Sequence, residues 1–336
     1  MSVDIEQPDQ LLTYLKQTNR ISPTEIPQIQ ILRGGVSNKT VLVKRSNNQS
    51  WVLKQALPKL RVEVDWFSDP ARIHREALAL KILPSLSPPN TITPLIFEDP
   101  ANHLLAMQAV DEPHDNLKTL FMSAQIDPNH LQQFGHIIGV IHSNSTGRSD
   151  LAQLFDDRSF FESLRIEPYY RYTAQQVPQA ASTLNHLIQT THSRRLCLVH
   201  GDYSPKNILV NNHKLILLDH EVIHFGDPAF DLGFALAHLL SKAHHFPAQR
   251  LAFAAATQTF WTSYTNAIQS APWRTDIESH AAFHAVACLL ARVAGRSKLE
   301  YLTQEERQKQ MNLAIHLLQS RPTSIDELLN RFLSQL

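Results

Sequence analysis

One stretch constrains this 336-residue chain more than any other, because it sets carboxylate and amide side chains between short apolar runs. It runs Leu-Val-His-Gly-Asp-Tyr-Ser-Pro-Lys-Asn-Ile-Leu-Val at 198–210, and then Leu-Leu-Asp-His-Glu at 217–221. Among its polar side chains, the two carboxylates and the amide of Asp202, Asn207 and Asp219 are the informative ones. They are far enough apart in the chain to meet only if the protein folds around a cleft.

These residue types suit phosphoryl transfer, which needs Mg²⁺ on the phosphates, a group that orients the incoming hydroxyl, and charge that offsets the phosphate oxygens. Mg²⁺ prefers oxygen ligands, so the amide of Asn207 and the carboxylate of Asp219 are suitable. Asp202 is then left to accept the hydroxyl proton. The alternative is that Asp202 and Asn207 form a polar turn and that Asp219 ends a strand.

The stretch resembles the aminoglycoside phosphotransferase and choline kinase superfamily, whose members are relatives of protein kinases. His200, Gly201, Asp202 and Asn207 match the catalytic loop of that superfamily, and Asp219 matches its metal-binding aspartate. The resemblance implies an α+β, protein-kinase-like fold with two lobes, and ATP or GTP with Mg²⁺ as cofactors. It also implies that Asp202 is catalytic and that Asn207 and Asp219 bind the metal.

The first part of the chain predicts a strand-rich lobe. Gln28–Ala56 contains three short apolar runs separated by turns, which indicate antiparallel strands. A helix is expected over about Pro70–Leu83, with Asp69 as its cap, and two more strands at Thr93–Phe97 and His103–Val110. We therefore expect residues 1–110 to form a nucleotide-binding lobe.

The remaining residues, 111–336, predict a mostly helical lobe that carries the catalytic loop and the substrate-binding helices. Asp127-Pro128 and Asp227-Pro228 are both typical helix starts. A hairpin is expected between Ile208–Val210 and Lys214–Leu218, with Asn211-Asn212 as its turn. Three or more helices should complete the chain.

The nucleotide is expected under the loop Leu32–Asn38, between the first two strands. This loop is similar to the Gly-x-Ser-Asn form of the superfamily, and its backbone N–H groups could contact the phosphates. The predicted nucleotide-binding residues in the loop are Gly34, Gly35, Ser37 and Asn38. A plain glycine-containing hairpin turn is the alternative.

Lys54 on the third strand and Glu76 on the following helix are expected to form the ion pair that holds the α- and β-phosphates. Glu76 lies three residues after Ile73 and four before Leu80, which places it on or beside the apolar helix face. The alternative is an exposed Arg72–Glu76 pair with Lys54 in solvent.

Other polar residues near the motif have less specific predictions. Asp231 could hold the catalytic loop through backbone N–H groups, as the resemblance implies, or lie on a helix surface. His200 is expected to be architectural. Asp227 should cap the helix that begins at Pro228, and Lys206 either contacts the γ-phosphate or is solvated.

Two unusual segments could line the acceptor pocket. Phe160–Arg171 combines aromatic residues with arginines and glutamates, and Leu290–Leu302 has Gly295 in a helical pattern. Equally, Tyr169 could belong to the core and Arg292 could be a helix-end cation. The C-terminal helices are not conspicuously acidic, so a neutral or anionic metabolite is at least as plausible an acceptor as an aminoglycoside.

Composition narrows the classes of partner. Lys plus Arg equals Asp plus Glu at 31 each, which argues against nucleic acid and against a polybasic membrane surface. No signal sequence and no membrane span is expected, so we predict a cytoplasmic protein whose partner is a small molecule. Cys197 and Cys288 are expected in the core, and the pair His280 and His284 lacks a third metal ligand.

The alternatives to a small-molecule kinase are a pseudokinase and a protein kinase. A nucleotide-binding pseudokinase would have no need of Asp202, Asn207 and Asp219 together. A protein kinase is disfavoured by the His-Gly-Asp sequence and by the short interval between Asp219 and the helix at Asp227, which cannot hold an activation segment. The acceptor, the choice between ATP and GTP, and the oligomeric state are not identified by the sequence.

Overall fold

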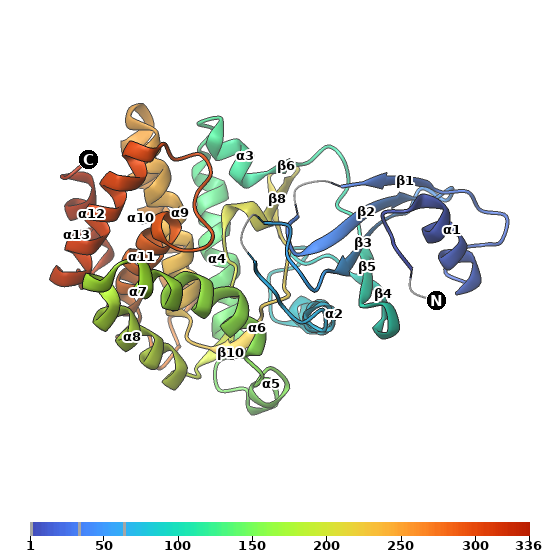
Figure 1. The fold of residues 1–336 in the computed structure, drawn as a ribbon, viewed down its shortest axis with the longest axis horizontal. Helices are drawn as coiled ribbons and strands as arrows, with labels where there is room; N and C mark the ends of the chain where they lie inside the picture. Colours follow the sequence, from blue (N-terminus) through green and yellow to red (C-terminus); the bar gives the residue numbers. More distant parts are fainter. Residues whose placement is uncertain (1–2, 33–34, 63–64) are drawn as a thin grey trace.

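The computed structural model describes residues 3–32, 35–62 and 65–336. A twisted antiparallel sheet with flanking helices lies at one end of the molecule, and a larger helical part lies at the other (Figure 1). This arrangement confirms the predicted α+β, protein-kinase-like fold with two lobes. The predicted lobe boundary at residue 110 stays a prediction.

The sheet carries the nucleotide-side residues on its inner strands. Its strands follow the order β1 (Gln28–Ile31), β2 (Asn38–Lys44), β3 (Ser50–Ala56), β5 (Leu104–Gln108) and β4 (Leu95–Asp99), all antiparallel. Lys54 lies opposite Thr40 on β2 and Leu105 on β5. Its position on the central strand is therefore fixed from both sides.

Helix α2 (Arg72–Ile82) packs against β3, β4 and β5 and turns Glu76 towards the sheet. The helix exists as predicted, but it begins two residues later than Pro70, and its N-cap residue is Ala71, which makes no side-chain cap. The prediction that Asp69 caps the helix is therefore wrong. Asp69 Oδ1 instead accepts the N–H of Ala71 at 2.9 Å in the turn that precedes the helix.

A helix that the sequence analysis did not predict precedes the sheet. This is α1 (Pro8–Gln17), whose Leu11 and Leu15 are fully buried against the sheet residues Val41 and Trp51. Leu11 and Leu15 are four residues apart, and Pro8 is the first helical residue, so the signal for a short amphipathic helix was present.

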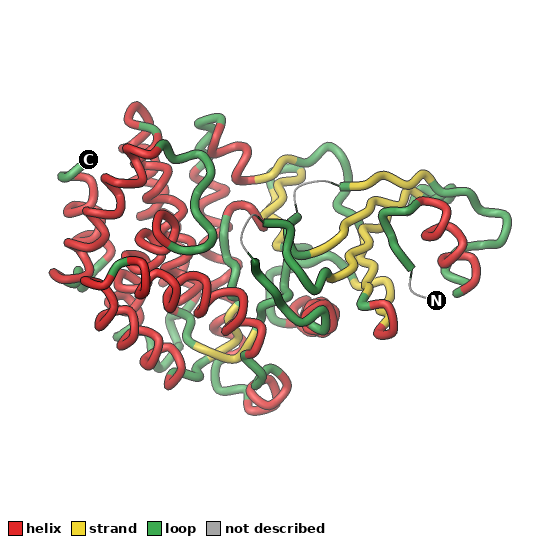
Figure 2. Tube along the Cα trace, in the orientation of Figure 1, coloured by secondary structure: helices red, strands yellow, loops and turns green. Residues whose placement is uncertain are grey.

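The helical part carries two further small sheets (Figure 2). Its helices are α3 (Leu117–Met122), α4 (Pro128–Ser145), α5 (Ser149–Leu154), α6 (Ser159–Phe161), the π-helix η3 (Glu162–Arg171), α7 (Tyr172–Gln176), α8 (Pro178–Ser193), α9 (Ala229–His245), α10 (Arg250–Ala267), α11 (Ile277–Ala294), α12 (Gln304–Ser320) and α13 (Ile325–Leu333). One sheet consists of β7 (Cys197–Val199) and β10 (His224–Gly226), and the other has the order β6 (Asp115–Asn116), β8 (Ile208–Asn211), β9 (Lys214–Leu217). Four 3₁₀ turns complete the described elements, at 83–85, 100–102, 205–207 (η4) and 247–249.

The β8–β9 hairpin differs from the prediction by one residue in its turn. Asn211 pairs with Lys214, so the two turn residues are Asn212 and His213 and not Asn211-Asn212. Both have positive φ, at 48° and 62°. A two-residue hairpin of this kind needs left-handed backbone at both central residues, which His tolerates less readily than Asn or Gly.

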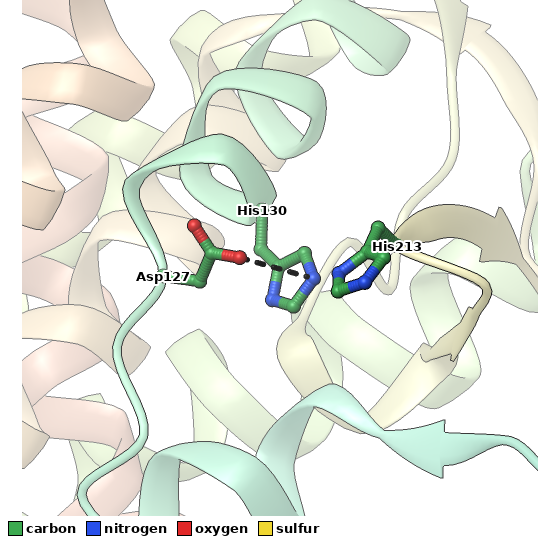
Figure 3. A group of neighbouring side chains, drawn as sticks. All are labelled: Asp127, His130 and His213. Carbon is green, nitrogen blue, oxygen red and sulfur yellow. Dashed lines mark ion pairs between the residues drawn. The ribbon is translucent and has the colours of Figure 1, made fainter.

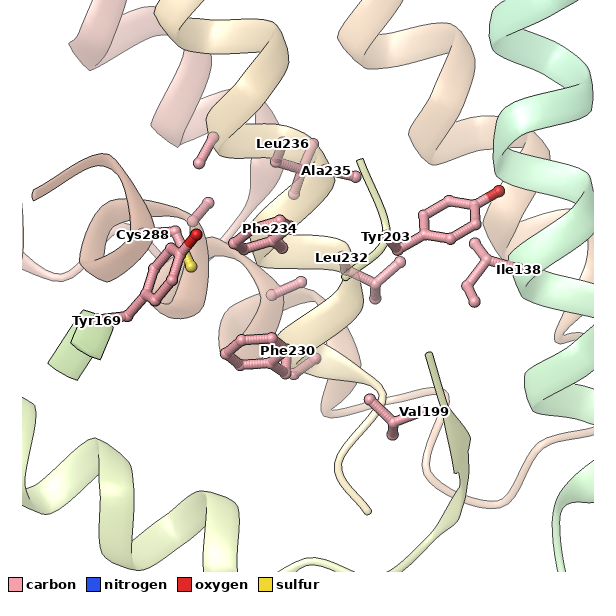
Figure 4. Close-up of a cluster of buried hydrophobic side chains, with 14 of the residues drawn as sticks. Ile138, Tyr169, Val199, Tyr203, Phe230, Leu232, Phe234, Ala235, Leu236 and Cys288 are labelled. Carbon is pink, nitrogen blue, oxygen red and sulfur yellow. The ribbon is translucent and has the colours of Figure 1, made fainter. Parts of the chain in front are cut away.

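Helix α9 forms the centre of the helical core (Figure 4). Phe230 and Phe234 stack on each other with ring centroids 5.8 Å apart, and both are almost completely buried. Gly233 lies between them, where an added Cβ would come within 2.3 Å of the Cβ of His284 on α11. The absence of a side chain at Gly233 is thus what lets α9 and α11 approach closely. Cys197 and Cys288 are both fully buried, as predicted.

Among the described helices, none combines the length and the apolar character that crossing a bilayer requires.

Candidate active site

A cleft of about 800 Å³ opens between the sheet and the helical part. The predicted site residues that line it are Gly35, Ser37, Asn38, Lys54, Asp202, Asn207 and Asp219. Glu76 lies directly behind Lys54, and Gly34 is outside the described residues. The structure therefore brings together all of the predicted site residues that it describes.

The loop that carries Asp202 is held by a buried carboxylate. Asp231, on the first turn of α9, accepts the N–H of His200 at 2.7 Å and the N–H of Gly201 at 2.8 Å. Burial alone would raise the pKa of Asp231, but the contact with His142 and the hydrogen bond from the N–H of Gly201, among others, together lower the pKa. Asp231 is thus an ionised anchor and not a surface carboxylate.

His200 completes the support of the loop. Its Nε2 lies 3.1 Å from the carbonyl oxygen of Leu218, and its Nδ1 accepts the N–H of Asp202 at 3.2 Å. Burial lowers the pKa of His200, so the ring is neutral and carries its proton on Nε2. Because both nitrogens are engaged, the ring links the loop that carries Asp202 to the residue that follows β9 and is not a free base.

The carboxylate of Asp202 is oriented by two donors. Its Oδ2 accepts the Nδ2 of Asn207 at 2.8 Å and lies 2.8 Å from a guanidinium nitrogen of Arg165. Arg165 also donates to the carbonyl oxygen of Gly201 at 2.7 Å. Asp202 lines the cleft, and among the described residues no group hydrogen-bonds its Oδ1. Arg165 was predicted only as part of a possible pocket segment.

Lys54 lies between two carboxylates. Its Nζ is 2.7 Å from Oε1 of Glu76 and 2.9 Å from Oδ1 of Asp219. The predicted contact with Glu76 therefore forms, and the alternative of a solvated Lys54 is wrong. An ammonium has three donors, so one remains for a ligand.

The pKa values of Lys54, Glu76 and Asp219 follow from their arrangement, because the one ammonium pairs with both carboxylates. Burial would lower the pKa of Lys54, but Asp219 and Glu76 raise it instead, so the ammonium stays charged. Burial would also raise the pKa of Asp219, which Lys54 lowers. Burial raises the pKa of Glu76 to about 7, because Lys54 offsets only part of the burial cost.

Glu221 and Arg72 are site residues that the sequence analysis missed. Oε2 of Glu221 accepts the Nδ2 of Asn38 at 3.0 Å and the Nε of Arg72 at 3.1 Å. Arg72 is completely buried and also donates to the carbonyl oxygens of Ser37 and Leu57. Arg72 therefore pairs with Glu221 and not with Glu76. The only signal was its place one helical turn before Glu76.

The donor atoms at the cleft suit a hard divalent cation. Asn207 donates both amide hydrogens to Asp202, at 2.8 Å and 3.0 Å, which leaves its Oδ1 as the free atom. One ligand atom from each of Glu76, Asp219 and Glu221 lies within 4.8 Å of the others. Carboxylate and amide oxygens are the ligands that Mg²⁺ prefers, so these residues fit the predicted metal.

Cationic side chains line the far end of the cleft. Arg292, near the end of α11, donates to Tyr169 Oη at 3.0 Å and to Ser297 Oγ at 2.7 Å. Arg296 also lines the cleft and lies 3.1 Å from Glu167. Behind them, burial and the nearby Lys118 and Arg292 lower the pKa of the completely buried Lys242 to about 7. Both sequence segments proposed for the acceptor pocket therefore reach the cleft.

Comparisons with known proteins agree with this geometry. The model of the phosphotransferase enzyme family known as APH matches residues 28–266. A curated relative, methylthioribose kinase 2 of Oryza sativa subsp. japonica, is 22% identical over 263 residues. That match covers 68% of this chain and 61% of the relative, so the chain spans less than two thirds of the relative's length.

Solved structures share the fold at low sequence identity. Choline kinase from Cryptosporidium parvum superposes with a TM-score of 0.59 at 11% identity, over 97% of this chain and 98% of its own. An amicoumacin kinase, solved with AMP-PNP and Ca²⁺, gives 0.57 at 12% identity over 94% and 95%. The family match covers well over half of the chain and contains Asp202, Asn207 and Asp219. The chain belongs to the phosphotransferase enzyme family.

Proposed function

We propose that this protein is a Mg²⁺-dependent small-molecule kinase that transfers the γ-phosphate of ATP or GTP to a hydroxyl group of a metabolite. The observation that carries the proposal is the orientation of Asn207. Its amide nitrogen donates twice to Asp202, which leaves the side-chain oxygen free, and its backbone carbonyl accepts the N–H of Leu218, the residue before Asp219, at 2.9 Å. One residue thus joins the acceptor-orienting carboxylate to the metal ligands.

Each residue has a distinct part in the proposed reaction. Lys54 uses its remaining donor on the α- and β-phosphates, and the loop at Gly35–Asn38 covers them. Asn207 and Asp219 would hold Mg²⁺, which neutralises charge on the phosphate oxygens when bound. Asp202 would accept the proton of the acceptor hydroxyl through Oδ1 as the hydroxyl oxygen bonds to the γ-phosphorus, while the bond between that phosphorus and the bridging oxygen breaks and the nucleoside diphosphate leaves. Positioning and charge therefore supply most of the rate.

The acceptor is proposed to be neutral or anionic. Arg292 has no carboxylate within ion-pair distance among the described residues, although it is mostly buried and lines the cleft. A buried guanidinium of this kind favours an acceptor that brings hydroxyl or acidic oxygens. Methylthioribose is included among the candidates because of the curated relative.

The test is nucleotide consumption with a panel of hydroxylated acceptors. The panel contains methylthioribose, sugars, hydroxylated amino acids and, as cationic contrasts, choline and an aminoglycoside. We expect turnover with a neutral or anionic acceptor, with Mg²⁺ required. Asp202→Ala should abolish turnover and leave nucleotide affinity nearly unchanged, whereas an active Asp202→Ala variant would remove Asp202 from the mechanism.

A pseudokinase is the alternative from another class. It would bind nucleotide with Mg²⁺ but consume none with any acceptor in the panel. The presence of Asp202, Asn207 and Asp219 in one cleft favours the enzyme, because a binding module needs no group to orient an acceptor.

We also propose that the protein works in the cytoplasm. Its proposed partner is a small-molecule substrate, and we propose neither a nucleic acid nor a membrane as a partner.

A further inference from the structure

A second cluster of metal-ligating side chains lies outside the cleft, where helix α4 begins beside the β8–β9 turn (Figure 3). Asp127 and His130 come from the start of α4, and His213 comes from the turn. Together they line a separate cavity of about 540 Å³, and none of the three lines the cleft. The proposed reaction uses none of them.

His130 is the observation that points to a missing ligand. Only 6% of this residue is exposed, yet neither ring nitrogen has a hydrogen-bond partner among the described residues. Its Nε2 lies 3.7 Å from Oδ2 of Asp127, which is beyond hydrogen-bond distance. Buried polar atoms without partners are rare in folded proteins because they lose their bonds to water.

Asp127 and His213 each have a potential ligand atom close to the ring of His130. Asp127 uses Oδ1 to cap α4 by accepting the N–H of Asn129 at 2.9 Å, so Oδ2 is available. His213 is exposed, and Figure 3 shows its ring directed towards His130. The turn is fixed against α4 by Gln133, which donates to the carbonyl oxygen of His213 at 2.8 Å and accepts the N–H of Leu215 at 3.1 Å.

We propose that Asp127, His130 and His213 bind a Zn²⁺ ion, with water at the fourth position. One ligand atom from each residue lies within 4.8 Å of the others. Two imidazole nitrogens and one carboxylate oxygen form a set that suits zinc, with bonds of about 2.0–2.2 Å. The exposed His213 ring can make the small movement that such bonds require.

The position of the site gives it a structural consequence. The hairpin that His213 closes connects Asn207 to Asp219, so zinc would fasten this connection to helix α4. The helix dipole opposes a cation at a helix N-terminus, but the negative charge of the Asp127 carboxylate, which caps this N-terminus, offsets that repulsion. The site is therefore a clamp that acts on the hairpin rather than on the substrate.

The experiment is a Zn²⁺ titration of the metal-stripped protein in excess Mg²⁺, which occupies the oxygen-rich cleft. A chromophoric chelator reports zinc binding, and Co²⁺ substitution reports geometry through its visible absorption. We expect one equivalent of zinc and a tetrahedral Co²⁺ spectrum. His213→Asn should weaken zinc binding at least tenfold, since it removes a ligand from an exposed turn position whose left-handed backbone Asn accepts.

His136→Asn is the matched control, because His136 is an exposed residue of the same helix and lines a different cavity. It should bind zinc as the native protein does. The proposal is overturned if His213→Asn and His130→Gln both bind zinc with native affinity, or if the native protein binds none under these conditions. Because the readout is metal binding, failure here leaves the proposed kinase function unaffected.

Discussion

In the proposed reaction, Arg165 would set the geometry without contacting the phosphates. It contacts both the carboxylate of Asp202, the proposed acceptor-orienting group, and the carbonyl oxygen of Gly201, so it holds the side chain and its loop together. Arg165 is itself held in a buried position, where its charge is compensated by Asp202. Its function is therefore one of positioning.

We predict that Arg165→Gln lowers kcat by about 10- to 100-fold and leaves nucleotide affinity within about twofold, because a small displacement of an orienting group costs this much. Steady-state kinetics with the best acceptor, together with nucleotide binding by calorimetry, measures both quantities. Arg171→Gln is the control. Arg171 lies on the same π-helix, but its side chain is half-exposed and pairs with Glu162, at 3.5 Å, and not with Asp202. Equal kcat values for the two variants would show that Arg165 does not position Asp202.

Glu76 gives the protein a pH-dependent stability. Its pKa is about 7 in the folded chain and 4.5 ordinarily, so between these values the folded state holds a proton that the unfolded state has released. The free energy of unfolding therefore falls as pH rises through this window. The contribution is fully present below about pH 4.5 and is lost as the pH passes 7.

Glu76→Gln should flatten this dependence. The variant has no proton to lose, so between pH 5 and 8 its free energy of unfolding should decline less than that of the native protein, by roughly 1 to 3 kcal/mol. Urea unfolding at four pH values without divalent cations measures the difference. Glu327→Gln is the control, since hydrogen bonds from Thr323 lower the pKa of Glu327 and keep it ionised throughout. Parallel curves for native protein and Glu76→Gln would contradict the assignment.

At the scale of elements, the contact between α9 and α11 depends on Gly233. An added Cβ would lie 2.3 Å from His284 Cβ and 2.6 Å from the backbone nitrogen of Ala285. Alanine is the better helix former by about 1 kcal/mol, so at a free helical position Gly233→Ala would stabilise the chain. Here the helices must separate, and we expect a loss of about 1–3 kcal/mol in the free energy of unfolding, measured by urea denaturation. A gain in stability would show that the two helices can move apart without cost.

The elements that the sequence predicted well are those specified by local signals. Asp127 caps α4 and Pro128 begins it, as its residue types indicate, because capping depends only on neighbouring backbone groups. The hairpin turn was displaced by one residue because His213 adopts a left-handed conformation that its type does not favour. Helix α1 was missed because its two core leucines give a short pattern.

The site residues that could be predicted are those with a recognisable place in the sequence. Asp202, Asn207 and Asp219 occur in a recognisable order, and Lys54 with Glu76 follows from strand and helix order. Arg165, Arg72 and Glu221 could not be assigned, because a charged residue is expected at the surface until its partner is known. Their partners are distant in sequence and become neighbours only in the folded chain.

At the scale of the whole molecule, Arg72 and Glu221 connect the two sides of the cleft. Arg72 belongs to α2 and contacts the carbonyl oxygen of Ser37 in the predicted nucleotide loop, while Glu221 follows the β8–β9 hairpin of the helical part. Asn38 donates to the same carboxylate oxygen. The ion pair is almost completely buried, so its two charges depend on each other.

We predict that Arg72→Met destabilises the protein by about 3–5 kcal/mol, because removing one partner leaves the buried charge of Glu221 without its cation. This is a large part of the roughly 5–15 kcal/mol that holds a typical domain folded. Lys81→Met is the control, since Lys81 lies on the same helix in a half-exposed pair with Glu98, and such pairs contribute about 0–1 kcal/mol. The double variant Arg72→Met with Glu221→Gln should recover part of the loss, as measured by urea unfolding in chelator. If the two single effects simply add, the buried pair does not couple the two sides of the cleft.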